Sequence, residues 1–175
     1  IVSAIVALPT LGALLLLLVR DEHNEGLIRK AALVVSLLVF AETLLLAWEF
    51  NPASADFQFV VRYAWIPAFG ISYAVGVDGI SLWLVVLTGF LRPIAQLSAW
   101  ESVHHKTRAY CMMVLLLESA MLGVFVSIDL FLFYVFWDAM LIPMYFLIGV
   151  WGYERRVYAA VKFILYTMAG SVLML

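Results

Sequence analysis

Apolar residues occur in long stretches along the chain, and short polar segments that carry most of the charges separate them. About 20 apolar residues form an α-helix long enough to cross the hydrocarbon core of a bilayer. The pattern predicts an all-α membrane protein, a single membrane domain over residues 1–175 whose six transmembrane helices occupy 1–19, 31–50, 80–99, 110–128, 130–150 and 157–175. The last stretch has no polar flank, so we expect the helices to be the first six of a larger bundle.

The segment between the second and third stretches has a different pattern. Apolar side chains alternate with their neighbours over 57–65 and again over 71–77, and a period of two is typical of β-strands. The two runs predict a β-hairpin outside the membrane, between helices two and three. Asp78 and Asp129 immediately precede the third and fifth stretches, where an aspartate side chain can cap the first turn of a helix.

Basic residues are distributed unevenly among the connections. The first, third and fifth connections carry seven, whereas the second and fourth carry one, Arg62. Because short cytoplasmic loops are enriched in Lys and Arg, the odd connections are predicted to be cytoplasmic. The N-terminus is then periplasmic, in the inner membrane of a bacterial cell. The seven basic residues are Arg20, Arg29, Lys30, Lys106, Arg108, Arg155 and Arg156.

Composition narrows the functional classes. Hydrophobic residues make up 66% of the chain and charged residues 13%, with a net charge of -2, so the lipid bilayer is an expected partner and nucleic acid is not. Cys111 is the one cysteine, which excludes an intrachain disulfide framework and a cysteine-rich metal site. His104 and His105 lie in a charged loop without further ligands at metal-binding spacing. We therefore expect no metal or cofactor in this chain.

Three ionisable side chains, Glu118, Asp138 and Lys162, lie inside consecutive apolar stretches. Helix geometry places them roughly 12, 18 and 7 Å from the cytoplasmic side. Charged groups at such depth are rare and mark ion or proton paths. Only residues 127–129 separate the fourth and fifth stretches, so the two acids are expected on neighbouring antiparallel helices. A carboxylate there either takes up a proton or pairs with a cation, as a proton relay requires.

Structural roles for the same residues stay open. Either carboxyl group could join two helices by a hydrogen bond, and Lys162 could extend its ammonium group to the membrane surface. Arg92, about seven residues from the cytoplasmic end of the third stretch, is expected to extend to the surface in the same way. Glu42 lies near mid-membrane with no partner evident from the sequence. Pro143 removes a helical hydrogen bond beside Asp138, which favours water there.

Several segments resemble a known family. LLLESAMLGVF at 115–125 and DLFLFYVFWDAMLIPMYFLIG at 129–149 are similar to the proton-channel core of the antiporter-like membrane subunits of NADH:quinone oxidoreductase, respiratory complex I. VDGISL at 77–82 and YAAVKFILYT at 158–167 also resemble that family. Among its members the chain resembles chain M, called subunit 4 in mitochondria, and residues 1–76 match in layout more than in motif.

This resemblance implies a subunit that couples electron transfer from NADH to quinone with proton pumping. The whole complex would be the enzyme, and no redox chemistry would occur in this chain. FMN, iron–sulfur clusters and quinone would belong to partner subunits, and other membrane subunits of complex I would be its neighbours. Glu118, Asp138 and Lys162 would be the family's buried acidic and basic residues, which transfer protons.

Two residues depart from the family pattern. The family has glutamate after the tryptophan of the fifth helix, whereas this chain has Asp138, whose side chain is one methylene shorter. Arg92 precedes Pro93, where the family commonly has an uncharged residue. Family members also continue past the position of Leu175 and hold further lysines there, so we expect only the first part of a proton path in this chain.

Two other functions stay open. A subunit of a related cation/proton antiporter or membrane-bound hydrogenase would use the same helices, although LIPMY at 141–145 favours chain M. A non-transporting membrane scaffold would use the buried charges only to pair helices. Sequence following Leu175, or co-purification with a flavin and iron–sulfur arm, would distinguish these functions.

Overall fold

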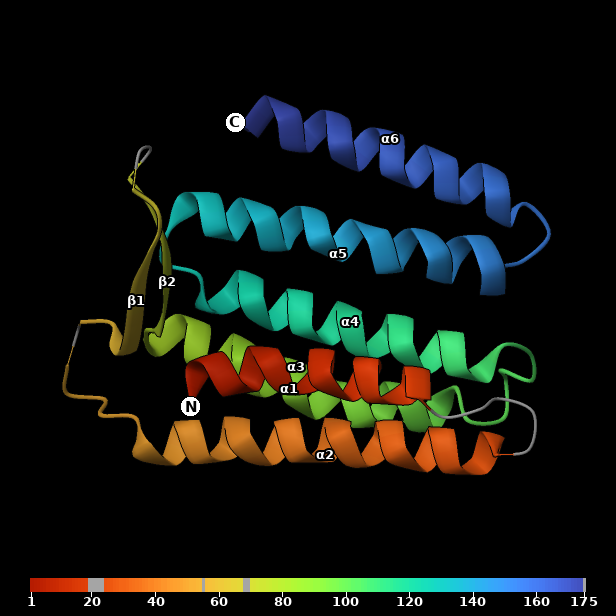
Figure 1. Ribbon diagram of the computed structural model, residues 1–175, viewed down its shortest axis with the longest axis horizontal. Helices are drawn as coiled ribbons and strands as arrows, with labels where there is room; N and C mark the ends of the chain where they lie inside the picture. The colour runs from red at the N-terminus through yellow and green to blue at the C-terminus, as the bar shows by residue number, and fades with distance from the viewer. Residues whose placement is uncertain (19–23, 55, 68–69, 175) are drawn as a thin grey trace.

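The computed structural model describes residues 1–18, 24–54, 56–67 and 70–174. Within these residues the chain forms six α-helices and one two-stranded antiparallel hairpin (Figure 1). The elements are α1 Val2–Leu18, α2 Glu25–Glu49, β1 Gln58–Ile66, β2 Ile71–Val77, α3 Gly79–Ser98, α4 Thr107–Val126, α5 Leu130–Trp151 and α6 Arg156–Met174. The predicted helical fold, with a hairpin between the second and third helices, is confirmed.

Five helices, α2 to α6, are long and apolar enough to cross a membrane, and α1 is an apolar helix of 17 residues. The predicted ends at Val19 and Leu175, and the loop residue Arg20, lie outside the described residues. The helix that contains the predicted span 31–50 begins earlier, at Glu25, so that Arg29 and Lys30 of the predicted first connection are helical. Hydropathy marks only the apolar part of a helix, whereas backbone hydrogen bonding continues through charged turns at the membrane surface.

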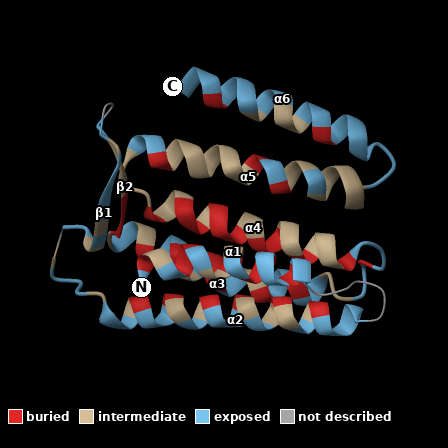
Figure 2. Cartoon of the chain, in the orientation of Figure 1, coloured by how far each residue is buried: buried red, intermediate tan, exposed pale blue. Residues whose placement is uncertain are grey.

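The helices lie side by side and alternate in direction (Figure 1). The hairpin lies at one end of the bundle, and the last turn of α1, the first turn of α2 and the α3–α4 and α5–α6 connections lie at the opposite end. The central helix is α4, which packs against α1, α2, α3 and α5. Ten of its 20 residues are buried, compared with two of the 19 residues of α6 at the edge of the bundle (Figure 2).

The apolar core is divided into two clusters along the bundle axis. The cluster nearer the hairpin includes Val85 and Leu122, and the other includes Ile28 and Leu115. Because α4 contributes Leu115 to one cluster and Leu122 to the other, Glu118 lies at the level between them. An ionisable residue therefore lies at the centre of the bundle formed by α1 to α4, with apolar side chains on both sides of it.

Both predicted caps are confirmed. The Asp78 carboxylate accepts a hydrogen bond of 2.7 Å from the Ser81 amide, and the Ser81 hydroxyl accepts one of 2.9 Å from the Asp78 amide. The first of these hydrogen bonds is the main cause that lowers the pKa of Asp78. Asp129 accepts hydrogen bonds from two first-turn amides of α5 and from the amide and hydroxyl of Ser72 in β2. This aspartate therefore caps α5 and also attaches the hairpin to it.

Candidate functional site

The Glu118 side chain is fully buried inside the bundle and contacts two other helices. Its Oε2 atom accepts a hydrogen bond of 3.2 Å from the Ser36 hydroxyl on α2. The same oxygen lies 3.4 Å from Nε of Arg92 on α3. The Arg92 side chain is only 11% exposed, so the two charges form a buried ion pair. Three helices are joined at this one carboxylate.

The prediction that Arg92 extends to the membrane surface is wrong. The buried face of α3 includes Thr88, Gly89, Pro93 and Gln96, and Arg92 lies on the same side, beside the anion of Glu118. Burial removes the guanidinium from water, which is costly. The attraction of a nearby anion offsets this cost when the two groups are well placed. The sequence signal that could have revealed this placement is the spacing of four between these polar residues, 88, 92 and 96.

The pair is incompletely hydrogen-bonded. Among the described residues, neither Oε1 of Glu118 nor Nη2 of Arg92 has a hydrogen-bond partner, although both atoms are buried. Buried polar atoms in proteins almost always have a partner, in the protein or in bound water. The free carboxylate oxygen is therefore an open acceptor for a proton or a water molecule.

A second polar contact lies next to Glu118 and connects α4 to α1. The Ser119 hydroxyl donates to the Val6 carbonyl, and its oxygen lies 2.7 Å from that of Thr10. Since the Ser119 proton is committed to Val6, the Thr10 hydroxyl is the donor in the second hydrogen bond. These hydrogen bonds hold α1 against α4 and involve only uncharged groups. The charged groups of this region are those of Glu118 and Arg92.

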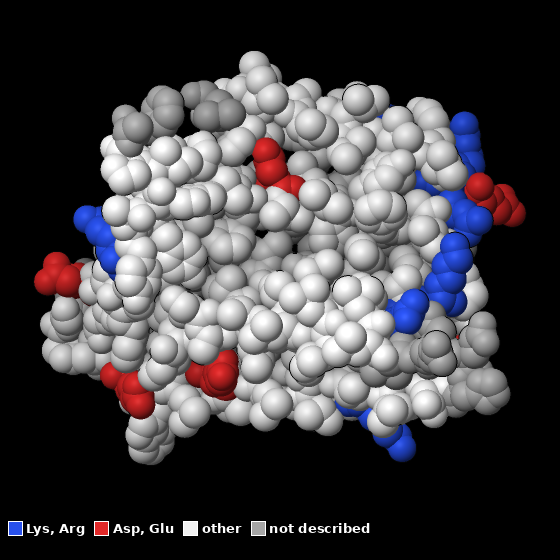
Figure 3. Space-filling model, viewed as in Figure 1, with Lys and Arg blue, Asp and Glu red and all other residues white. Residues whose placement is uncertain are grey.

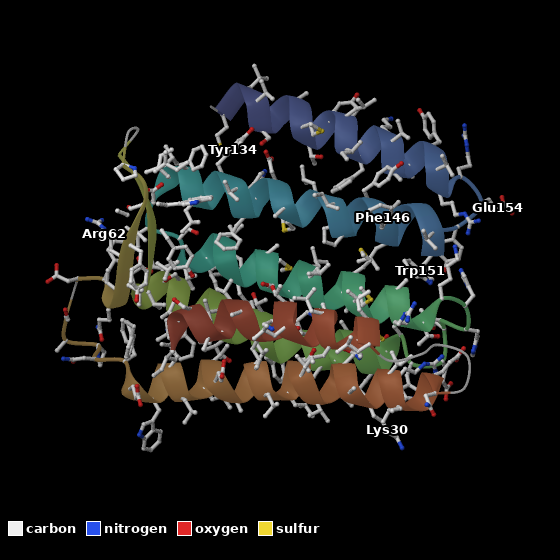
Figure 4. The ribbon with its side chains drawn as sticks, in the orientation of Figure 1. Lys30, Arg62, Tyr134, Phe146, Trp151 and Glu154 are labelled. Atoms are coloured by element: carbon white, nitrogen blue, oxygen red, sulfur yellow. The ribbon has the colours of Figure 1, made fainter. Side chains whose placement is uncertain are left out.

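Asp138 lies in a different environment. It is half-buried on α5, and its Oδ1 accepts a hydrogen bond of 2.8 Å from the Ser171 hydroxyl on α6. Pockets of about 270 Å³ and about 190 Å³ lie towards the two ends of the α5–α6 seam, one lined in part by Tyr134 and the other by Phe146 (Figure 4). Neither pocket is lined by Asp138 or Ser171, so the pair lies between them.

Lys162 lies on the exposed side of α6. Its ammonium nitrogen is 5.9 Å from the ring centre of Tyr158 and 5.8 Å from that of Tyr166, one turn to either side. Cation–π contacts of this kind stabilise a charge where water is scarce. Ser171, which binds Asp138, is nine residues further along the helix, about 13 Å at 1.5 Å per residue.

The three predicted residues are thus not in contact with one another in the described part of the chain. Glu118 is paired with Arg92, Asp138 with Ser171, and Lys162 with two tyrosine rings. Glu42 is half-buried on α2, and its Oε2 atom has no hydrogen-bond partner among the described residues. No group of His, Cys, Asp or Glu that could hold a metal ion is found in the same residues.

Comparison with known proteins relates the chain to one family. Residues 127–175 match the family described as NADH:quinone oxidoreductase/Mrp antiporter, transmembrane. NAD(P)H-quinone oxidoreductase chain 4 3 of Picosynechococcus is 45% identical over 174 residues, covering 99% of this chain and 31% of that protein. NADH-quinone oxidoreductase subunit M of Rhodobacter capsulatus is 46% identical over 178 residues, covering 100% and 34%. The chain spans about a third of the length of these curated relatives.

Solved structures agree with the sequence comparison. A chain of respiratory complex I from Thermus thermophilus with bound NADH has a TM-score of 0.82 at 29% identity, covering 98% of this chain and 33% of that chain. A chain of the archaeal membrane-bound sulfane sulfur reductase has a TM-score of 0.76 at 20% identity, which shows a shared fold alone. With its long apolar helices, the chain is an integral membrane protein. Over its whole length it is similar to the subunit M and chain 4 membrane subunits of NADH:quinone oxidoreductase, and its residues 127–175 match the antiporter family.

Proposed function

We propose that this chain is part of a proton-translocating membrane subunit of NADH:quinone oxidoreductase, which couples electron transfer from NADH to quinone with proton pumping. The similarity to subunit M and chain 4 proteins over the whole chain supports this function. Electron transfer would take place in partner subunits that hold FMN, iron–sulfur clusters and quinone. The role of this chain would be to carry protons among other membrane subunits of the complex.

The observation that carries the proposal is the buried pair of Glu118 and Arg92. An arginine keeps its charge in proteins, so only the carboxyl group of this pair can change its protonation state. When Glu118 takes up a proton, the Arg92 charge is left buried without its anion, which is costly. The proton and the guanidinium therefore compete for the carboxylate. A charge that arrives nearby changes the outcome of that competition, as coupled proton transfer requires.

Asp138 and Lys162 would continue the path. The Ser171 hydroxyl donates to the aspartate and holds it at the α5–α6 seam, on the helix next to that of Glu118. Lys162 would act at the outer face of α6, where its ammonium group is exposed in this chain and stabilised by two tyrosines. Transfer between Asp138 and Lys162 would need intervening carriers, since helix geometry separates them.

The proposed location is the bacterial inner membrane, with the hairpin on the periplasmic side. Lys and Arg side chains gather at the end of the molecule opposite the hairpin, and acidic side chains are more frequent toward the hairpin end (Figure 3). This distribution follows the positive-inside rule if the α1–α2, α3–α4 and α5–α6 connections are cytoplasmic.

A non-transporting scaffold is the second candidate function, and a specific observation favours it. The carboxylates of Glu118 and Asp138 each accept a hydrogen bond from a serine on another helix, Glu118 from Ser36 and Asp138 from Ser171. Such bonds also join helices in membrane proteins that transport nothing. The scaffold needs the hydrogen bonds but not the exchange of a proton.

Replacement of each carboxyl group by its amide separates the two functions. Glu118→Gln and Asp138→Asn keep size and hydrogen bonding but cannot titrate. The relay predicts that the intact, assembled complex carries out slower pumping-coupled turnover with a lower ratio of protons to electrons. The exposed Glu49 at the end of α2 provides a matched control, Glu49→Gln, which should behave as the native enzyme. Normal stoichiometry in both assembled amide variants would leave the scaffold as the function.

A further inference from the structure

Buried polar atoms without partners are concentrated between α3 and α4. Of the seven buried side-chain nitrogen and oxygen atoms that lack a hydrogen-bond partner in the described residues, five belong to Arg92, Gln96, Thr107 and Glu118. The other two, on Ser3 and Glu42, are on different helices. Each unpartnered buried group costs free energy, so a cluster of them calls for a common explanation.

The four residues form a line from one end of the bundle to its centre. On α4, Thr107, Cys111 and Glu118 are all buried at helical spacings of four and seven, so they share one face of the helix. On α3, Gln96 and Arg92 lie one turn apart, and Arg92 contacts Glu118. The line therefore begins beside the α3–α4 connection and ends at the Glu118 carboxylate.

A small cavity of about 10 Å³ lies at the outer end of this line, and Gln96, Thr107 and Cys111 are among its lining residues. This is roughly the smallest space that admits one water molecule. Gln96 and Thr107 each have one buried side-chain oxygen without a hydrogen-bond partner among the described residues, and both side chains are more than nine-tenths buried. The cavity is therefore polar enough, as well as large enough, for water.

Arg29 of α2 covers the outer side of the cavity. Its guanidinium donates to the Trp100 carbonyl and, at 2.6 Å, to the Val103 carbonyl, while its own carbonyl accepts from Gln96. The Arg29 side chain lines the cavity and is 15% exposed, so it reaches from the cavity to the surface of the bundle.

We propose that the α3–α4 seam binds a short file of water molecules, from the cavity beside Gln96 and Thr107 to Oε1 of Glu118, and that Glu118 exchanges its proton along this file. The purpose of the file rests on the proposed function. From Cys111 to Glu118 the distance along α4 is about 10 Å. At the Glu118 end, Arg92 contributes its Nε beside the carboxylate and a buried Nη2 without a partner among the described residues. Its unpartnered N–H groups orient water but do not release a proton. Each water accepts one proton and passes one on, and the last proton converts the Glu118 carboxylate to the acid.

Hydroxyl-radical footprinting of the intact complex by X-ray radiolysis tests for the water. Radicals formed from bound water oxidise adjacent reactive side chains, and Cys111 lines the cavity although it is only 2% exposed. We expect oxidation of Cys111 in the native enzyme, normalised to the exposed Tyr153. We expect this oxidation to fall severalfold in the Gln96→Leu/Thr107→Val double variant. Thr88→Val is the matched control, because the Thr88 hydroxyl donates to Leu84 within its own helix and lines no part of the cavity.

The route is tested by coupled turnover of the same enzymes. The double variant should slow coupled turnover severalfold, and Thr88→Val should not. If the double variant fails to assemble, footprinting of the native enzyme and turnover of Thr107→Val alone decide the matter. Absence of Cys111 oxidation in the native enzyme, or normal turnover in the assembled Thr107→Val and double variants, overturns the proposal. Failure of the proposed function is a different result, namely normal proton-to-electron stoichiometry in both the Glu118→Gln and the Asp138→Asn enzymes, and the footprint does not depend on it.

Discussion

Nε of Arg92 lies 3.4 Å from Oε2 of Glu118, and the two side chains are buried between the apolar clusters of the bundle. This contact joins α3 to α4 and pairs the fully buried acid of the fold with a permanent cation. In the proposed relay it gives Glu118 a competitor for its proton within the same bundle, and its consequences can be measured directly.

Replacement of Arg92 by methionine should leave Glu118 predominantly protonated, because a buried carboxylate without a cation is costly. Carbodiimides react with protonated carboxyl groups, so labelling of Glu118, followed by mass spectrometry, should increase in Arg92→Met. Labelling of Asp138, which is held by Ser171, provides the internal control. Unchanged labelling of Glu118 would mean that Arg92 does not control its protonation.

Loss of one partner of the pair should also be more harmful to stability than loss of both. A broken buried ion pair typically costs about 3–5 kcal/mol. Arg92→Met alone should lower the temperature of unfolding more than the Arg92→Met/Glu118→Gln double variant does. Equal losses in the two variants would show that the unpaired Glu118 carboxyl group adds no cost once Arg92 is removed.

Asp138→Glu should preserve or raise coupled turnover in the intact complex. The longer side chain restores the residue of the family pattern and extends the reach of the carboxylate, which is half-buried and bonded to Ser171 in the native chain. The Ser171→Ala variant tests the partner in the same assay, since loss of its hydrogen bond should reduce turnover. If Asp138→Glu abolishes activity in a normally assembled enzyme, the local packing is specific for aspartate.

Gly123→Ala should destabilise the contact between α4 and α5. A Cβ atom at Gly123 would lie 2.4–2.6 Å from the Phe136 ring, so the helices must separate or the ring must move. Overpacking of this kind costs about 1–3 kcal/mol. Gly170→Ala on α6 is the matched control, because a Cβ there meets no atom within 4 Å. The temperature of thermal unfolding in detergent should fall for Gly123→Ala only. Adding Phe136→Leu to Gly123→Ala should recover part of the loss.

The cap of α3 should make stability depend on pH in the acid range. The Ser81 amide lowers the pKa of Asp78 below its ordinary value of 3.8, so the ionised form stabilises the folded state. This contribution is fully present above pH 4 or so and is lost as pH falls through the lowered pKa. Asp78→Asn should remove that part of the acid dependence, whereas Asp56→Asn in the exposed loop should not. An identical acid profile for Asp78→Asn would contradict the assignment.

Impermeant thiol reagents should distinguish the two ends of the bundle. His104→Cys, in the exposed α3–α4 connection, should react from the cytoplasmic side, and Gln58→Cys, at the start of β1, from the periplasmic side. The native Cys111 is buried and should contribute little background. The reverse accessibility would invert the proposed orientation, and with it the side from which protons reach Glu118.

Local sequence features by themselves determined the helices, the hairpin and the caps. Apolar runs of membrane-spanning length, the alternation in 57–65 and 71–77, and an aspartate before a helix act through neighbouring residues, so they are legible along the chain. The exact start of α2 could not be predicted in this way, because the turn that contains Arg29 and Lys30 is helical although it lies outside the apolar run.

The partners of the buried charges were decided only by the tertiary structure. The sequence predicts that Glu118, Asp138 and Lys162 lie at membrane depth. It does not indicate how each helix is rotated about its axis. That rotation directs Arg92 inward to Glu118, sets Asp138 against Ser171, and leaves Lys162 on the outer face of α6. Rotation depends on packing between helices far apart in sequence, so no local pattern determines which charges meet.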